Sequence, residues 1–304
     1  MLKQLSDPGL GEKYYQNKNR IVNKDGSFNS KRKGMKWHLY HYLISIGTLQ
    51  ISTIIIITYL ITNCFFAMIY MIVGIEKLGG HHFGNVFLTG FLFSMQAFTT
   101  VGFGAIYPHD YLTGLISGME ALFGLLFFAF ATGIVYGRFS KPTAFIKFSE
   151  NAIIAPYKDG KAFMFRIVNA RPNTLIDMNV RIILAMKIEG KEGINRKYYN
   201  LDIETASVIF FPMPWTIVHH VNKNSPLHEL SQKDLEKLDA EFLIHIKGFD
   251  ETYSQTTNTI YSYQYHEIRW GRKFTLNYVL DKEGSVEYDI NRIGETEAVQ
   301  LPTN

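Results

Sequence analysis

The sequence contains one cysteine, Cys64, among 304 residues. A single thiol inside an apolar run excludes a disulfide framework, a cysteine zinc site and a paired cysteine nucleophile. The formal net charge is only +4, and the basic residues do not gather in one motif, so no nucleic-acid partner is expected. The first 36 residues are polar and basic without a short apolar core, so no cleavable signal peptide is expected.

Charged residues are missing from two long stretches. Residues 37–75 and 78–109 contain no Asp, Glu, Lys or Arg, whereas charges recur regularly after about residue 141. Uncharged apolar runs of this length suit the hydrocarbon core of a membrane. We therefore predict a basic arm at residues 1–36, a membrane domain at 37–141 and a soluble domain at 142–304.

Two segments of the membrane domain are long enough to span a bilayer. At about 1.5 Å per residue, residues 49–75 and 112–137 both exceed a hydrocarbon core of about 30 Å. Residues 87–98 are too short to span, which indicates a re-entrant helix between the two spans. The aromatic residues 37–46 predict an interfacial helix, with an extension of the first span as the alternative.

Basic residues flank the two spans and are nearly absent from the loop between them. Residues 1–36 carry nine Lys or Arg against three Asp or Glu. By the positive-inside rule, this predicts a multi-pass protein of the inner (plasma) membrane with both termini in the cytoplasm. We expect a basic edge to meet anionic lipid headgroups or the interfacial helix, although the arm could be only a disordered tail. Its members are Arg32, Lys33, Lys36, Arg138, Lys141 and Lys147.

A Thr-Val-Gly-Phe-Gly segment follows the short apolar helix. Rings of backbone carbonyls can replace the water shell of a potassium ion, provided that the backbone alternates between right- and left-handed conformations. Glycine reaches positive φ without a penalty, which suits Gly102 and Gly104 to alternate positions. The segment is typical of a potassium selectivity filter, formed by Thr100, Val101, Gly102, Phe103 and Gly104. Potassium is the only metal ion expected, and no cofactor is expected.

An acid and an aromatic face mark the second span. Glu120 is a functional-site candidate because an unpartnered acid in a spanning helix is costly; the alternative is a shallow, hydrated acid. Phe128, Thr132 and Tyr136 recur every four residues and share one helix face. They predict an apolar pore gate, with Gly133 as a bending point, or else simple packing between helices.

The soluble domain shows alternating apolar stretches at residues 162–168, 181–188, 215–218, 241–246 and 273–280. Turn signals separate or follow them, which predicts an antiparallel β-sandwich. A short helix is expected over residues 231–238, with Ser231 as its N-cap.

Several motifs resemble the inward-rectifier potassium channels, and most closely their prokaryotic branch. The resemblance covers roughly residues 35–280 and rests on matches in the family's order in both domains. The matching motifs are Phe-Leu-Phe-Ser-Met-Gln at 91–96, Glu-Ala-Leu-Phe-Gly at 120–124, the run from Thr132 to Pro142, Ser-Pro-Leu at 225–227, Asp-Ala-Glu-Phe-Leu at 239–243, Gly-Phe-Asp-Glu-Thr at 248–252 and His-Glu-Ile-Arg-Trp-Gly at 266–271.

The resemblance implies an α+β homotetramer in which two transmembrane helices and a pore helix form one central pore, with a cytoplasmic immunoglobulin-like β-sandwich on each subunit. It implies a cytoplasmic constriction at Gly248, Phe249, Asp250 and Glu251, and filter support from Gln96, Thr99 and Glu120. It also places Phe128 and Tyr136 at pore-lining positions. Voltage-gated channel activity is a further expectation.

The sequence departs from the family pattern at several positions, among them the absence of a basic residue at Ala105 and Ile106 after the filter and of acids in the interfacial helix. Phe103 replaces the usual filter tyrosine, Gln96 replaces a frequent glutamate, and Phe128 stands where strong rectifiers carry an acid. The alternatives are a less selective or differently gated cation channel, a membrane-anchored sensor or binding module, and an anchored enzyme. A protein that is only anchored in a membrane has no use for the filter segment. We recognise no Ser/His/Asp set, paired acids or phosphate-binding loop that would support an enzyme.

Overall fold

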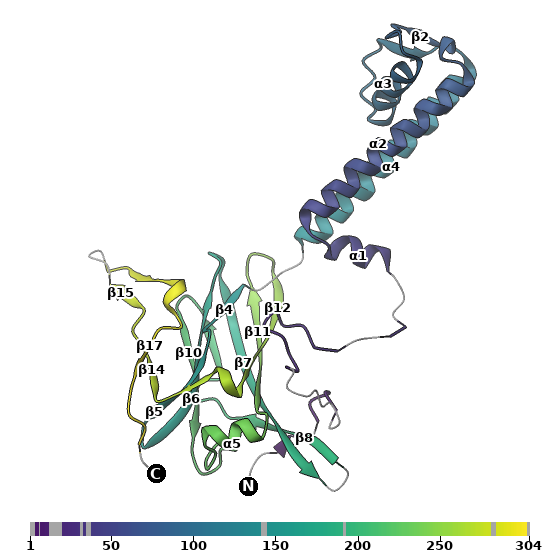
Figure 1. Ribbon diagram of the computed structural model, residues 1–304. Helices are drawn as coiled ribbons and strands as arrows, with labels where there is room; N and C mark the ends of the chain where they lie inside the picture. The colour runs from purple at the N-terminus through teal and green to yellow at the C-terminus, as the bar shows by residue number, and fades with distance from the viewer. Residues whose placement is uncertain are drawn as a thin grey trace. The chain divides into compact units, whose positions relative to one another are not determined.

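The computed structural model describes residues 4–5, 7–11, 20–30, 33–34, 38–140, 145–190, 193–280 and 284–302 (Figure 1). The chain forms two units, a helical unit of residues 34–141 and a β unit of residues 1–33 and 142–304. Three members of the predicted basic edge, Arg32, Lys36 and Lys141, lie outside the described residues. Residue 37 of the predicted interfacial helix also lies outside the described residues. His38 is described and precedes the first residue of the helix.

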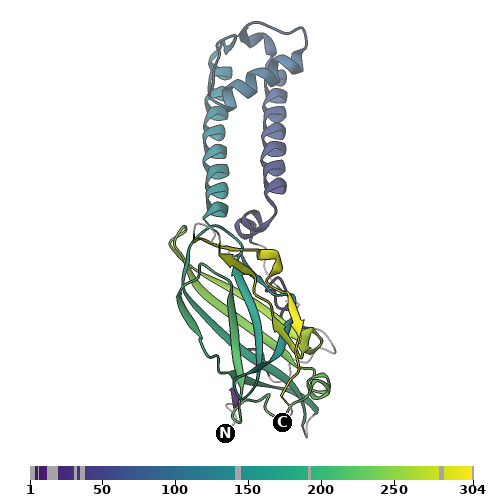
Figure 2. The same ribbon diagram turned by 90° about the vertical axis from the view of Figure 1, so that its left-hand side faces the viewer.

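The helical unit contains two long apolar helices and two shorter ones. They are α1 (Leu39–Ser45), α2 (Thr48–Val73), α3 (Val86–Phe98) and α4 (Tyr111–Phe139). Helices α2 and α4 are long and apolar enough to cross a membrane. In the most apolar 18 residues of each helix, only 22% of α2 and 11% of α4 is buried within the chain. Such low burial does not suit the core helices of a soluble protein. Figure 2 shows these two helices running alongside α3 at one end.

The loop between α2 and α4 is closed by a small ribbon. A 3-10 turn, η1 (Ile75–Lys77), follows α2, and β2 (Leu78–Gly80) pairs antiparallel with β3 (Ile106–Pro108). Helix α3 and the glycine-rich segment lie between these two strands in sequence. The Asp110 side chain then caps α4 by accepting a 2.8 Å hydrogen bond from the Thr113 amide.

The β unit is built on two sheets. The larger sheet has the order β1-β8-β7-β11-β12, with β9 paired to β7; the second has the order β10-β6-β5-β13, with β4 paired to β6. The larger contains β1 (Gln4–Leu5), β7 (Leu175–Gly190), β8 (Gly193–Leu201), β9 (Ser207–Phe210), β11 (Glu241–Asp250) and β12 (Gln255–Gln264). The second contains β4 (Ile146–Phe148), β5 (Ala152–Tyr157), β6 (Gly160–Asn169), β10 (Trp215–Val221) and β13 (Ile268–Trp270). The predicted β-sandwich is confirmed, except that β13 pairs with β5 in parallel.

Shorter elements complete the β unit. Two strand pairs join β14 (Arg272–Phe274) to β17 (Thr296–Ala298) and β15 (Tyr278–Leu280) to β16 (Val286–Tyr288). The helical turns are α5 (Gln232–Lys237), η2 (Tyr265–Glu267) and η3 (Ile290–Arg292). Ser231 caps α5 as predicted, through its hydroxyl and the Asp234 amide.

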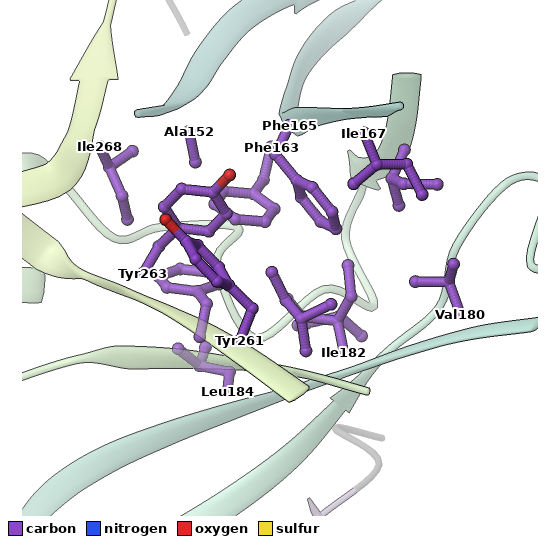
Figure 3. Packing of buried hydrophobic residues seen from close by; sticks show 14 of the residues in the cluster. Ala152, Phe163, Phe165, Ile167, Val180, Ile182, Leu184, Tyr261, Tyr263 and Ile268 are labelled. Atoms are coloured by element: carbon purple, nitrogen blue, oxygen red, sulfur yellow. The ribbon is translucent and has the colours of Figure 1, made fainter. Parts of the chain in front are cut away.

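The core of the β unit lies between the inward faces of the two sheets. Alternate residues of one strand point to one face, so Phe163 and Phe165 of β6 enter the same cluster. The Phe163 ring stacks on Phe242 of β11 at 4.2 Å between centroids. Figure 3 shows labelled side chains of β6, β7 and β12 gathered in this cluster.

The prediction of one strand over residues 273–280 is wrong. The segment divides into β14 and β15, and the residues between them are held by a side chain of β6 and by the Glu295 carbonyl, which accepts from the Thr275 amide at 3.1 Å. Arg166 of β6 donates to the Thr275 carbonyl at 3.0 Å and to Asn277 Oδ1 at 3.2 Å.

The interpretation of the N-terminal arm as a disordered tail is wrong for residues 20–30. Ile21 and Val22 are buried in a cluster with Ala185, Tyr198 and Leu243 of the larger sheet. Apolar burial of this kind holds the segment to the β unit.

Candidate functional site

The segment after α3 has the backbone that the sequence predicts at its glycines. Gly102 has φ +55° and Gly104 has φ +78°, and Thr100 has φ +57°. The left-handed conformation of both glycines is thus confirmed, while that of Thr100 was not predicted because threonine seldom adopts it. Left-handed residues therefore recur at every second position, which is the alternation that carbonyl groups facing one side require.

The end of α3 anchors the start of this segment. The amide of Thr100 donates to the Ala97 carbonyl, and the amide of Val101 donates to the Gln96 carbonyl, both at 3.1 Å. The Thr99 hydroxyl donates to the Met95 carbonyl at 2.6 Å, within its own helix. The first amides of the segment are therefore satisfied by carbonyls of α3, which fixes the start of the segment to the end of that helix.

Glu120 is fully buried and joins three helices. Its Oε1 contacts the Ser94 hydroxyl of α3, and its Oε2 accepts a 2.7 Å hydrogen bond from the Tyr70 hydroxyl of α2. Glu120 thus contacts the short apolar helix that precedes the Thr-Val-Gly-Phe-Gly segment, and the hydrated-acid alternative is wrong. Sequence reasoning missed Tyr70, Ser94 and the adjacent Asn63. Polar side chains inside apolar runs mark such residues as candidates but do not indicate which of them meet Glu120.

Gln96 lies in the last turn of α3. Among the residues that the structure describes, Gln96 Oε1 is buried without a hydrogen bond. The structure therefore does not bring the Gln96 oxygen into the cluster around Glu120.

Phe128, Thr132 and Tyr136 of the predicted gate lie on one face of α4, and all three are exposed. Phe128 is 45% exposed and its ring centroid lies 6.2 Å from that of Phe98, the last residue of α3. Tyr136 lies about 12 Å further along the helix and is 72% exposed. Thr132 and Gly133 are exposed between them, and α4 continues through Gly133 without a break.

The predicted cytoplasmic loop is shorter than the sequence suggests. Gly248, Phe249 and Asp250 belong to β11, and the turn itself covers only residues 251–254. The Asp250 side chain is fully buried. Its carboxylate accepts hydrogen bonds from the side-chain amide of Asn173 at 2.8 Å and from the backbone amide of Thr252 at 2.9 Å. The Asp250 carboxylate therefore holds the turn in shape, and Glu251 is the exposed acid of this group.

The described members of the basic edge have different surroundings. Arg138 donates to the Leu43 carbonyl of α1 at 3.0 Å and reaches the Thr48 hydroxyl at 3.5 Å, which links the end of α4 to α1. Lys147 donates to Asn291 within the β unit, and Lys33 is exposed.

Comparison with known proteins relates both units to ion channels. Residues 146–304 match the family model described as inward rectifier potassium channel C-terminal domain, and residues 54–141 match the one described as ion channel. The chain is 30% identical over 284 residues to the inward rectifier potassium channel Kirbac3.1 of Paramagnetospirillum magnetotacticum, which covers 91% of this chain and 96% of the relative.

Mammalian proteins are similar over a comparable span. Identity is 26% over 312 residues to the mouse G protein-activated inward rectifier potassium channel 4, covering 93% of this chain and 74% of that protein. Identity is 28% over 317 residues to the human G protein-activated inward rectifier potassium channel 2, covering 93% and 73%.

Proposed function

Because the chain belongs to the inward rectifier potassium channel family and is similar to its prokaryotic branch, we propose that four copies surround one potassium-selective pore. The family consists of membrane ion channels, so the chain is a subunit of such a channel and not an enzyme. Its function requires no cofactor, since potassium is the permeant ion.

One observation carries the potassium selectivity. Positive φ at Thr100, Gly102 and Gly104 alternates along a segment anchored to α3, between two helices that can span a membrane. Carbonyls of Thr100, Val101, Gly102 and Phe103 replace the water around the ion. The missing phenol hydroxyl of Phe103 does not remove a coordinating group, so selectivity for potassium over sodium is expected.

The expectation of voltage-gated channel activity is wrong in detail. The family is that of inward rectifiers, and voltage sensors depend on rows of arginine in a spanning helix. Within the described residues, α2 contains no arginine and α4 contains only Arg138, in its last turn.

The remaining predicted roles follow from this pore. Phe128 forms an apolar gate, with Tyr136 as a second ring and Thr132 and Gly133 between them. Glu251 faces a cytoplasmic vestibule at the β11–β12 turn, next to Gly248, Phe249 and Asp250. The basic edge contacts anionic headgroups from the cytoplasmic side, where both termini lie. We also propose that the β unit, as the cytoplasmic domain, controls the opening of this gate.

Ion flux from the purified full-length chain in liposomes tests the proposal. Uptake of potassium should exceed that of sodium, and Gly102→Ala should lose this preference, because left-handed alanine costs about 1–2 kcal/mol. Equal uptake of both ions by the wild type would leave only a less selective cation channel. The same assay with and without anionic lipid tests the basic edge, which has no lipid role if flux is the same in both.

A further inference from the structure

Four polar side chains lie together inside the helical unit. Asn63, Tyr70, Ser94 and Glu120 each have no exposed surface, and they come from α2, α3 and α4. No Lys, Arg or His forms an ion pair with Glu120 among the residues for which the structure gives positions. The hydrogen bonds of the cluster must therefore determine which form of the acid it holds.

The orientation of the Asn63 amide follows from its neighbour in α2. Asn63 Nδ2 lies 2.7 Å from the Tyr59 carbonyl oxygen, which can only accept a hydrogen bond. The opposite amide orientation would place two acceptors against each other. Asn63 Oδ1 therefore faces the Ser94 hydroxyl, at 3.1 Å.

The protons available to the row of oxygens can then be counted. Asn63 Oδ1, Ser94 Oγ and Glu120 Oε1 form two successive contacts, and each contact needs one proton. The Ser94 hydroxyl has one proton to donate, and Asn63 Oδ1 has none. Tyr70 donates to the other carboxyl oxygen, Oε2, at 2.7 Å. A second proton is therefore missing, and Glu120 Oε1 is the atom that can carry it.

We propose that Glu120 is a neutral carboxylic acid that relays hydrogen bonds between the helices and so positions α3. Tyr70 donates to Glu120 Oε2, Glu120 donates through Oε1 to Ser94, Ser94 donates to Asn63, and Asn63 donates to the Tyr59 carbonyl. A neutral acid also avoids an unpaired buried charge in a membrane-spanning helix. The proton assignment stands on the geometry alone, while the effect on selectivity rests on the proposed channel function.

Infrared spectroscopy of the full-length protein in liposomes at neutral pH tests the proton. We expect a carbonyl stretching band of a protonated carboxylic acid that shifts in D₂O and is absent from Glu120→Gln. The band should move to higher frequency in Tyr70→Phe, because the carbonyl oxygen loses its donor. Absence of the band from the wild type, or a band that Tyr70→Phe leaves in place, would overturn the relay.

Flux measurements on the same samples test the positioning. Glu120→Ala and Ser94→Ala should each lower the preference for potassium over sodium by about tenfold, the equivalent of one or two hydrogen bonds. Glu120→Gln should lose less than Glu120→Ala, since an amide both donates and accepts. Thr53→Val is the control, because among the described residues the Thr53 hydroxyl bonds only to Leu49 in its own helix, at 2.9 Å.

The two assays separate the relay from the channel function. A protonated band together with unselective flux in the wild type would overturn the proposed function and support the proton assignment. Selective flux without the band would overturn the relay and support the channel. If selectivity is the same in Glu120→Ala, Ser94→Ala and the wild type, the positioning role is wrong.

Discussion

Gly124 is required by a contact and not by its backbone conformation. A Cβ atom at this position of α4 would lie 1.8 Å from the carbonyl oxygen of Phe98, the last residue of α3. Real atoms do not approach so closely, so any side chain here must push α4 away from the end of α3. The proposed filter segment begins two residues after that end, at Thr100, so a displacement there would reach its carbonyl groups.

We predict that Gly124→Ala lowers stability by about 1–3 kcal/mol and reduces selective flux. The control is Gly114→Ala in the same helix, where an added Cβ meets no atom within 4 Å. Alanine is the better helix former by about 1 kcal/mol, so the control should be neutral or stabilising. Thermal unfolding and liposome flux measure both variants, and equal behaviour of the two would refute the contact.

His219 in the β unit is a second residue whose state follows from its partners. It is 3% exposed, and Nδ1 donates to the Asp202 carbonyl at 2.7 Å while Nε2 accepts from the Ser225 hydroxyl at 2.7 Å. A carbonyl can only accept, which assigns the ring proton to Nδ1. Burial lowers the pKa of His219 from its ordinary value of 6.5, so the folded protein keeps a neutral ring.

We predict that the β unit loses stability as the pH falls below 6.5. Below that pH the unfolded chain binds a proton that the folded chain refuses until its lower pKa is reached, so the loss is at most about 1.4 kcal/mol per pH unit. Urea unfolding, followed by tryptophan fluorescence at several pH values, measures the slope. His219→Gln should flatten it and the exposed His266→Gln should not; an equal slope in all three proteins would contradict the assignment.

At the scale of elements, hydropathy predicts the helical unit better than alternation predicts the sheets. The predicted spans at residues 49–75 and 112–137 differ by no more than two residues from α2 and α4, since long uncharged runs have sharp ends. Strand β12 reads Gln-Thr-Thr-Asn-Thr-Ile-Tyr-Ser-Tyr-Gln and gives no such signal. This strand forms because its backbone pairs with β11 along ten residues. Its own side chains do not indicate that partner.

The same limit applies to the candidate site. The positive φ of Gly102 and Gly104 and the partnered state of Glu120 could be predicted, because glycine spacing and a lone acid in an apolar helix are local signals. The partners Tyr70 and Ser94 could not be assigned, because they stand 50 and 26 residues from Glu120 and meet it only when three helices pack.

The N-terminal segment is an element held by two acids of the β unit. Glu241 is buried and accepts from the amides of Ile21 at 2.8 Å and Val22 at 3.2 Å. Glu267 forms ion pairs with Arg20 and with Lys24, the latter at 2.8 Å. The carboxylate of Glu241 accepts from both of these amides, so we expect the position of the segment to depend on Glu241.

We predict that Glu241→Ala releases residues 20–30 while the sandwich stays folded. Two buried amides would lose their acceptor at about 1–3 kcal/mol, which corresponds to faster hydrogen exchange of the segment by about 10- to 100-fold. Hydrogen–deuterium exchange of the full-length protein measures this. Glu236→Ala, on the exposed side of α5, is the matched control. Unchanged protection of Ile21 and Val22 would show that apolar burial alone holds the segment.

At the scale of the whole molecule, the proposed pore requires more than one chain. Val101 and Phe103 of the proposed filter are 54% and 79% exposed, so no other part of the described chain covers their side chains. Four copies around one axis would cover these side chains and close a ring of carbonyls at each level. The exposed face of α4 that carries Phe128 and Tyr136 would then line the path below the filter.

The final prediction concerns Phe128 in that assembly. If four Phe128 rings close the pore by dewetting, Phe128→Ala should raise basal potassium flux with the tetramer intact. If Phe128 only packs helices, its loss should leave a cavity beside Phe98 and Phe127, cost up to about 3–5 kcal/mol, and lower the tetramer yield without raising flux. Its 45% exposure favours the gate, since a core ring is more fully covered.

Phe130→Ala is the control for this experiment. Phe130 belongs to the same helix, is 71% exposed, and lies about 200° around the helix from Phe128 because successive residues differ by about 100°. Its removal takes away the same aromatic surface on the opposite side, so general weakening of α4 would affect both variants. A rise in flux confined to Phe128→Ala, with both proteins tetrameric by gel filtration, assigns the gate to that face. A rise in both variants would mean that the assembly leaks for lack of packing, and the gate would then have to be sought elsewhere.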